Sequence, residues 1–200
     1  MKFNHLIVDA SSIINFFKYY HSYYVGYDKK EKKPEFKLIF KDLKEFLVSK
    51  IVSGDIIVLD KVFDELRDPN LDYFKSEIEN YVVNSMEVFE DVTELITKYR
   101  IYENEKFYND NPVKINAELE LYENRYADLF LIAYANKLKK GSLNPLLITE
   151  ESFKPDSKLI PKLPFLCKRN NEHIFCRNLP YSLFEFYKDE LYFNLIVKST

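Results

Sequence analysis

The sequence contains very little glycine. Among its 200 residues, glycine occurs only at positions 26, 54 and 141. A dinucleotide-binding G-x-G-x-x-G turn and a phosphate-binding P-loop both need closely spaced glycines, because the backbone must approach the phosphates. Neither motif can be written anywhere in this chain. Dinucleotide-binding proteins and P-loop nucleotidases of the usual kind are therefore excluded.

Cysteine is almost as rare. Cys167 and Cys176 are the only two, and His173 lies between them. A structural zinc site takes four Cys or His ligands and normally includes a tight pair such as C-x-x-C. These three residues supply neither a tight pair nor a fourth ligand. We therefore expect two reduced, partly buried thiols, as is usual for a cytosolic protein.

Long apolar runs are missing too. No stretch approaches the roughly 18 consecutive apolar residues that would span a membrane. The apolar run near the N-terminus is too short for a signal peptide and lacks a small-residue cleavage site. These absences predict a cytoplasmic protein with no membrane partner. The formal net charge of -3 leaves nucleic acid open as a partner, because a local basic rim can coexist with an acidic centre.

Short apolar runs alternate with helical patterns along the chain. Runs at residues 3–8, 56–59 and 146–148 predict buried strands, and two more apolar pieces occur at 165–167 and 173–176. Helical spacing predicts helices over residues 13–20, 37–52, 62–66, 70–118 with a break at 109–112, 119–138, and from 179 onward. The alternation predicts an α/β fold with a mostly parallel central sheet flanked by helices. We expect one domain over residues 1–200, with a helical insertion around 88–118.

Acidic residues stand at or just beyond the ends of the apolar runs. Asp9 and Glu65 follow the first two runs, Asp128 opens an apolar stretch, and Glu150 and Glu151 follow the run at 146–148. Because parallel strands share a direction, acids that follow them gather along one edge of the sheet. Carboxylates in a crevice repel one another unless a cation offsets their charge. The pattern therefore predicts an acidic pocket at the C-terminal edge of the strands, a divalent metal and phosphate chemistry.

Several of these acids also have a plain structural explanation. Asp9 could cap the following helix, although Ser11 or Ser12 could do so instead and leave Asp9 at the sheet edge. Glu65 could be a solvated helix residue. Asp60, which follows the second strand, is better explained as a helix cap than as a ligand.

Asp128 is the most unusual acid, because the residues after it are apolar nearly all round a helix and are expected to be buried. A buried carboxylate needs a cation, hydrogen-bond donors or a charged partner, since leaving it unpaired costs several kcal/mol. Arg125 or Lys137 could be that partner, and a metal ion is the functional alternative. Either Glu150 or Glu151 could be an ordinary solvated loop residue.

Four short motifs together resemble the PIN-domain nucleases, a family that includes toxin ribonucleases of toxin–antitoxin systems. They are residues 8–14 (VDASSII), 64–66 (DEL), 126–135 (YADLFLIAYA) and 147–151 (LITEE). The segment around Cys167 and Cys176 also resembles a subgroup of PIN-like proteins of unassigned function. The chain departs from the family at Ala10, where Thr or Ser is common, and in its last acid, which is Glu rather than Asp.

The resemblance implies a site for Mg²⁺ or Mn²⁺, which prefer oxygen ligands. Its metal-binding and catalytic residues would be Asp9, Glu65, Asp128 and Glu151, with Glu150 as the alternative for the last acid. Ser11 and Thr149 would support these ligands by hydrogen bonding.

The implied activity is that of a metal-dependent endoribonuclease, acting as the toxin of a toxin–antitoxin pair. RNA would be the substrate, and an antitoxin protein and a second copy of the chain are the expected partners. The alternative is a catalytically inactive PIN-fold protein that binds nucleic acid or serves as a scaffold. Aspartyl-nucleophile phosphohydrolases and receiver domains are disfavoured, because the first strand offers a single acid. The lysine clusters at 29–33, 137–140 and 168–169 are better explained as solvated charge than as RNA contacts.

Overall fold

The computed structural model describes residues 3–20, 34–101, 126–151, 162–169 and 174–197 of the chain. Within these segments, four short strands form one sheet in which every neighbouring pair is parallel. They are β1 (His5–Val8), β2 (Ile56–Ile57), β3 (Pro145–Ile148) and β4 (Phe175–Arg177), in the spatial order β2-β1-β3-β4. This arrangement confirms the predicted α/β fold with a parallel central sheet.

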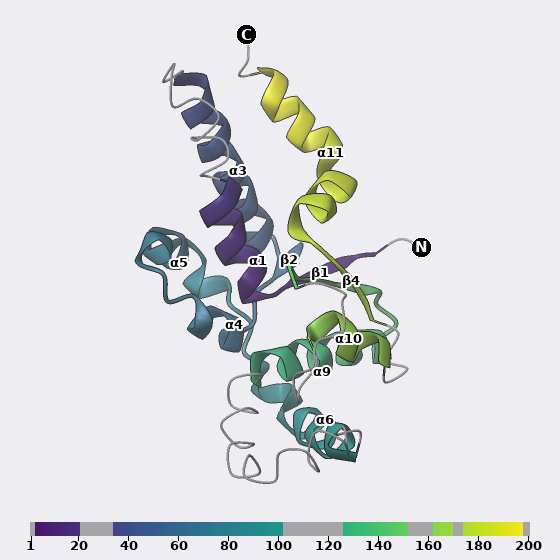
Figure 1. Cartoon of the computed structure of the whole chain (residues 1–200). Coiled ribbons are helices and arrows are strands. Elements are labelled where there is room, and N and C mark those ends of the chain that lie inside the picture. Colours follow the sequence, from purple (N-terminus) through teal and green to yellow (C-terminus); the bar gives the residue numbers. More distant parts are fainter. Residues whose placement is uncertain (1–2, 21–33, 102–125, 152–161, 170–173, 198–200) are drawn as a thin grey trace, which may run out of the picture.

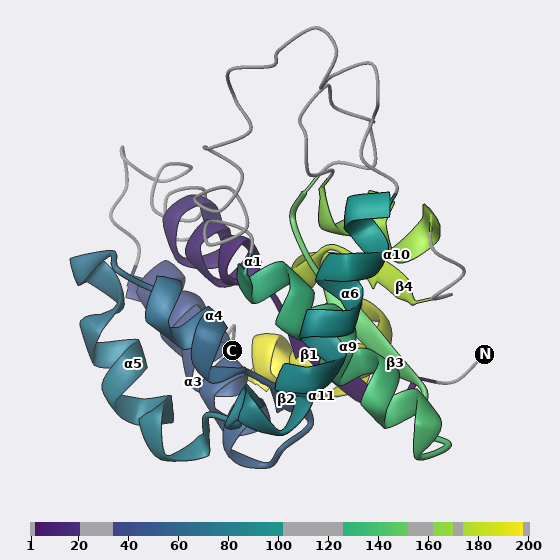
Figure 2. The same cartoon turned by 90° about the horizontal axis from the view of Figure 1, so that it is seen from below.

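Helices cover both faces of the sheet (Figure 1). On one side lie α3 (Pro34–Val52) and α11 (Leu179–Val197), and on the other lie α9 (Tyr126–Lys140), α6 (Phe89–Ile101) and α10 (Leu163–Arg169). Seen from below, α9 and α6 lie in front of the strands (Figure 2). The shorter helices α1 (Ala10–Asn15), α4 (Asp60–Glu65) and α5 (Asp72–Ile78) follow β1 and β2.

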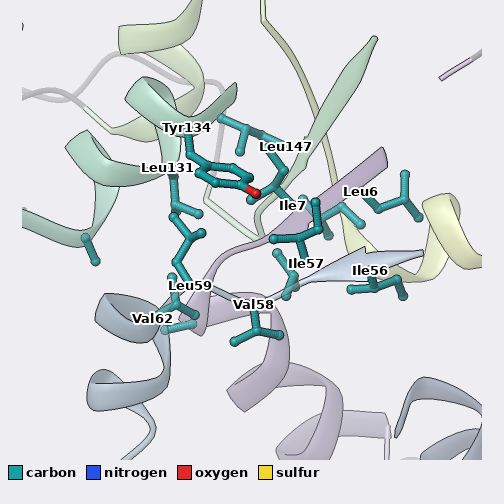
Figure 3. Close-up of a cluster of buried hydrophobic side chains, with 14 of the residues drawn as sticks. Leu6, Ile7, Ile56, Ile57, Val58, Leu59, Val62, Leu131, Tyr134 and Leu147 are labelled. Carbon is teal, nitrogen blue, oxygen red and sulfur yellow. The ribbon is translucent and has the colours of Figure 1, made fainter. Parts of the chain in front are cut away.

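The core lies between the sheet and these helices. All four residues of β3 are buried, and Ile7 and Val8 of β1 are fully buried as well. Figure 3 shows this cluster, in which β-strand side chains meet Leu131 and Tyr134 of α9 and Val62 of α4. Each fully buried aliphatic side chain contributes about 1.5–3 kcal/mol relative to an exposed one. Because both faces of the sheet are covered, β2, β3 and residues 6–8 of β1 are apolar and buried rather than alternating, whereas β4 is partly exposed.

The helix predicted over residues 37–52 is confirmed within α3, and the closing helix predicted from residue 179 is confirmed as α11. Between α3 and β2 the chain turns at Gly54, whose φ of 80° is readily adopted only by glycine. Of the apolar pieces, 165–167 lies in α10, and β4 begins within the piece at 173–176. Among the helices of the described segments, none combines the length and hydrophobicity needed to cross a membrane.

Two of the predicted helices differ from the structure, one in where it begins and one in being interrupted. The first helix begins at Ala10 rather than near Ile13, because Asp9 already occupies the N-cap position through its backbone. The long helix predicted from residue 70 is interrupted at 82–84, where Val83 forms a bridge to Leu59 and leaves the helical path. The chain then resumes in α6. Residues 102–118 of the predicted insertion, and 119–125 of the predicted helix before Asp128, lie outside the described residues.

Candidate functional site

Asp9 is the centre of the candidate site. It follows β1 directly, and its backbone N–H donates to the carbonyl of Ile148 at 2.9 Å, which fixes it against β3. Its side chain is only 6% exposed. The carboxylate oxygen Oδ2 accepts hydrogen bonds from the hydroxyl groups of Ser11 and Thr149, the latter at 3.0 Å. Two residues 140 positions apart in the sequence are thereby joined at one sheet edge.

The electrostatic setting of Asp9 favours its neutral form. Burial raises the pKa of the Asp9 carboxyl, the hydrogen bonds from Ser11 and Thr149 lower it, and the nearby carboxylate of Glu151 raises it again. The net effect is a pKa above the ordinary value of 3.8. Within the described residues, Asp9 forms no ion pair with a lysine or arginine. A bound cation would therefore relieve both the burial of this charge and its repulsion by Glu151.

Thr149 connects Asp9 to Glu151. The Thr149 hydroxyl donates to Asp9 and accepts the backbone N–H of Glu151 at 3.1 Å. Because Glu151 also acts on the pKa of Asp9 through its charge, the two carboxylates are neighbours. The contacts that the resemblance implied for Ser11 and Thr149 are therefore present on Asp9.

Glu150 and Glu151 each hold the first residue of a helix. The Glu150 carboxylate accepts the backbone N–H of Leu179, the first residue of α11, at 3.0 Å. The Glu151 carboxylate accepts the backbone N–H of Leu163, the first residue of α10, at 2.7 Å. Both acids thus have a structural task that sequence reasoning missed. Only Glu151 combines that task with an electrostatic effect on Asp9.

Asp128 and Glu65 differ in burial. Asp128 lies in the first turn of α9 and is 8% exposed, as its apolar surroundings predicted. Glu65 is the last residue of α4 and is exposed. In the part of the chain that the structure describes, no three His, Cys, Asp or Glu side chains lie close enough together to hold a metal ion. The expected four-acid cluster is thus not assembled there, and the metal-binding roles of Glu65 and Asp128 stay predictions.

The donor set still fits one kind of metal site. Mg²⁺ keeps several of its waters and is usually bound by one or two carboxylates, with substrate phosphate supplying further oxygens. Asp9 and Glu151 offer that number of carboxylates. Both hydroxyl donors use Oδ2 of Asp9, and within the described residues no side-chain donor contacts Oδ1. The residues therefore suit a site for a hydrated Mg²⁺ or Mn²⁺ ion and do not suit a site in which the protein supplies every ligand.

The prediction that Asp60 caps the helix after the second strand is wrong. The residue at the N-cap of α4 is Leu59, and Asp60 lies in the first turn. The carboxylate oxygen Oδ1 of Asp60 accepts both the hydroxyl and, at 3.2 Å, the backbone N–H of Ser85. It also accepts the backbone N–H of Lys61 at 2.8 Å. Ser85 is completely buried, so Asp60 joins α4 to the turn before α6.

The two serines after Asp9, Ser11 and Ser12, differ in their hydrogen bonding. Neither Ser11 nor Ser12 caps the helix, although both were candidates for that task. Ser11 donates to Asp9, whereas Ser12 is fully buried and its hydroxyl oxygen has no hydrogen-bond partner among the described residues.

A pocket of about 440 Å³ lies elsewhere, between α6 and α9. Its lining carries both signs of charge, and Lys140 forms an ion pair with Asp91 at 3.0 Å. It does not include any of the predicted site residues. Its mixed charge differs from the acidic pocket that the sequence predicts.

Comparison with known proteins yields one match. Among curated proteins and among solved structures, no match to this chain is found. A family described as "Domain of unknown function (DUF4411)" matches residues 30–177, well over half of the chain. The matched segment includes Glu65, Asp128, Glu150 and Glu151, and it begins after Asp9. The chain is therefore a member of the family described as Domain of unknown function (DUF4411).

Proposed function

We propose that this protein is a metal-dependent endoribonuclease with a PIN-like fold, and that its cation binds at Asp9 beside Glu151. One observation carries the proposal: a buried carboxylate at the C-terminal end of β1 accepts hydrogen bonds from two hydroxyl groups, is acted on by the charge of a second carboxylate, and has no lysine or arginine partner among the described residues. The parallel order β2-β1-β3-β4 is compatible with that fold. In open α/β sheets, the carboxyl ends of the strands are where ligands bind.

The chain's own residues have distinct tasks in this proposal. Ser11 and Thr149 fix the rotation of the Asp9 carboxylate by donating to Oδ2, so that Oδ1 serves as the metal ligand. Glu151 adds negative charge beside it. When bound, Mg²⁺ or Mn²⁺ would lower the pKa of a coordinated water and stabilise the leaving oxygen of a phosphodiester. Asp128 and Glu65 remain proposed ligands, acting directly or through water.

The biological setting follows from the resemblance alone. We propose that the nuclease is the toxin of a toxin–antitoxin pair in the cytoplasm, with an antitoxin and a second copy of the chain as partners.

The test compares two aspartates that follow adjacent strands. Mn²⁺ binding is measured by calorimetry, and cleavage of a mixed-sequence RNA is measured with Mn²⁺, for wild type, Asp9→Asn and Asp60→Asn. We expect Asp9→Asn to lose both binding and cleavage, and Asp60→Asn to keep both, because Asn can still accept the hydrogen bonds of Ser85. Equal binding and cleavage by wild type and Asp9→Asn would reject the proposed site. Circular dichroism confirms that each variant is folded.

A second candidate function is a PIN-fold protein that binds nucleic acid without cutting it. The absence of a three-acid metal cluster in the described segments favours this candidate. RNA binding without cleavage under any divalent metal, with Mn²⁺ affinity unchanged by Asp9→Asn, would support it over the nuclease.

A further inference from the structure

Lys61, at the edge of the sheet where Asp9 lies, has no carboxylate partner among the described residues. It is half-buried in the first turn of α4. Its ammonium group lies 5.9 Å from the ring centroid of Phe130. In the described segments it forms no ion pair, although Asp64 follows three residues later, where a helix brings side chains together.

The position of Lys61 follows from the sheet. Strands β1 and β2 are paired in parallel, Ile7 opposite Ile57, so the residues that follow them emerge at the same edge. α4 contacts both α1, which begins just after Asp9, and α9. Figure 3 shows Val62 of α4 beside Leu59, with Leu131 of α9 on the far side of Leu59. Lys61 is therefore beside the helix turn that contains Asp128, two residues before Phe130.

Two other half-buried lysines of the described segments, Lys50 and Lys75, have polar partners. Lys50 pairs with Glu190 at 2.8 Å and with Asp55 at 3.4 Å. Lys75 is comparable to Lys61, because its ammonium group also lies over a phenylalanine ring, 4.5 Å from the centroid of Phe63. Unlike Lys61, Lys75 also donates to the carbonyl oxygen of Leu66 at 3.1 Å. Of these two lysines over phenylalanine rings, Lys61 is the one whose ammonium group has no hydrogen-bond acceptor among the described residues.

We propose that Lys61 binds a phosphate of the RNA strand next to the phosphodiester that is cut. The ammonium group is a compact point charge suited to a phosphate oxygen, and the Phe130 ring supports its position without neutralising its charge. Acidic residues at the proposed metal site repel a polyanion, so a fixed cation at its rim would help to hold the strand. This inference rests on the proposed function for the identity of the polymer.

The experiment measures RNA binding separately from cleavage. Fluorescence anisotropy follows a labelled single-stranded RNA in EDTA, between about 50 and 200 mM salt, where each phosphate contact adds about 0.7 to the salt slope. Wild type is compared with Lys61→Ala, Lys61→Arg and the matched control Lys75→Ala. We expect Lys61→Ala to bind roughly fivefold to tenfold more weakly, as for one charge-assisted contact, with a slope smaller by about 0.7. Lys61→Arg should retain both values, and Lys75→Ala should change neither.

The outcomes separate this inference from the nuclease proposal. Unchanged affinity and salt slope in Lys61→Ala, or no RNA binding by wild type, would overturn the role of Lys61. If wild type cleaves RNA and Lys61→Ala cleaves with the same KM, the nuclease proposal stands and this inference falls. If RNA binding depends on Lys61 but wild type never cleaves RNA, the nuclease proposal falls, and Lys61 stands as an RNA-phosphate contact only. Thermal unfolding of each variant identifies any loss of binding that comes from misfolding.

Discussion

Two aspartates follow adjacent parallel strands of this protein, and their surroundings differ. Asp9 follows β1 and is buried, and the side-chain hydrogen bonds that it accepts come from two hydroxyl groups. The charge of Glu151 also acts on its carboxyl. Asp60 lies two residues past Val58 and accepts two backbone N–H groups as well as the Ser85 hydroxyl. The sequence around each is similar: an apolar run, an aspartate and a helix.

The hydrogen-bond donors around the two carboxylates distinguish Asp60, which links two segments, from Asp9, the proposed metal ligand. Backbone N–H groups have fixed positions, so Asp60 joins α4 to the segment at Ser85 through its Oδ1 atom. Hydroxyl groups can rotate, and each can accept as well as donate. Among the described residues, Asp9 has no lysine or arginine partner, and burial raises the pKa of its carboxyl. The predictions below test this contrast.

Replacing Thr149 with Val should produce the largest effect. It removes a donor from Asp9 and leaves the backbone N–H of Glu151 without its hydroxyl acceptor. We expect Mn²⁺ affinity to fall by roughly 10–100-fold, the usual cost of losing a hydrogen bond behind a metal ligand. Calorimetry measures the affinity, and Thr149→Ser, which keeps the hydroxyl, is the control. An equal loss of Mn²⁺ affinity in Thr149→Val and Thr149→Ser would show that packing, rather than the hydroxyl group, matters at this position.

Asp60→Ala should reduce stability without reducing activity. It leaves the buried hydroxyl and N–H of Ser85 without their acceptor, which costs about 1–3 kcal/mol. Urea unfolding measures the loss, with Asp60→Asn as a control that keeps an acceptor. An Asp60→Ala protein that is as stable as wild type would contradict the structural role of this aspartate.

Glu150→Ala and Glu151→Ala should be alike in stability and unlike in metal binding. Each removes the acceptor of a helix-initiating N–H, of Leu179 or Leu163, at a cost of about 1 kcal/mol. Only Glu151→Ala should also weaken Mn²⁺ binding, because Glu151 is the acid that acts on Asp9. Hydrogen exchange at the two leucine amides checks the first point and calorimetry the second. Equal Mn²⁺ affinities would remove Glu151 from the proposed metal site.

The raised pKa of Asp9 predicts a pH dependence of stability in EDTA. Burial is its main cause, so the folded protein holds this proton more tightly than the unfolded chain does. The stabilisation from the neutral carboxyl is complete below the unfolded pKa and is lost as pH rises through the folded pKa. Asp9→Asn should therefore gain stability relative to wild type between about pH 4 and neutral pH. A difference that does not change over this range, measured by urea unfolding, would contradict the prediction.

Ser12→Ala should have the smallest effect. The Ser12 hydroxyl is buried and has no hydrogen-bond partner among the described residues, so its removal leaves none of their polar groups newly unsatisfied. We expect a change in the free energy of unfolding within about 0.5 kcal/mol of zero, or a slight gain. Ser11→Ala is the contrast, because it removes a donor from Asp9 and should weaken Mn²⁺ binding. A large destabilisation by Ser12→Ala would indicate a partner in a segment beyond the described residues.

Features that depend on neighbouring residues could be predicted from the sequence. The strands are apolar because both faces of the sheet are covered, and the position of Asp9 follows from the end of β1. Contacts between distant segments could not be predicted. Asp60 meets Ser85 across 25 positions, and Glu150 meets Leu179 across 29. Nothing in the local pattern of an acid after a strand identifies such partners, because tertiary packing selects them.

The pairing of β1 with β3 has a consequence for how the protein forms during synthesis. The Asp9–Thr149 hydrogen bond spans 140 positions. At a synthesis rate of about 5–20 residues per second, β1 would leave the ribosome on the order of 10 s before its central partner exists. Such non-local pairing is slow because a long loop must close first. A nascent chain of this protein would therefore lack the Asp9–Thr149 hydrogen bond, and with it the proposed metal site, until residue 149 has been made.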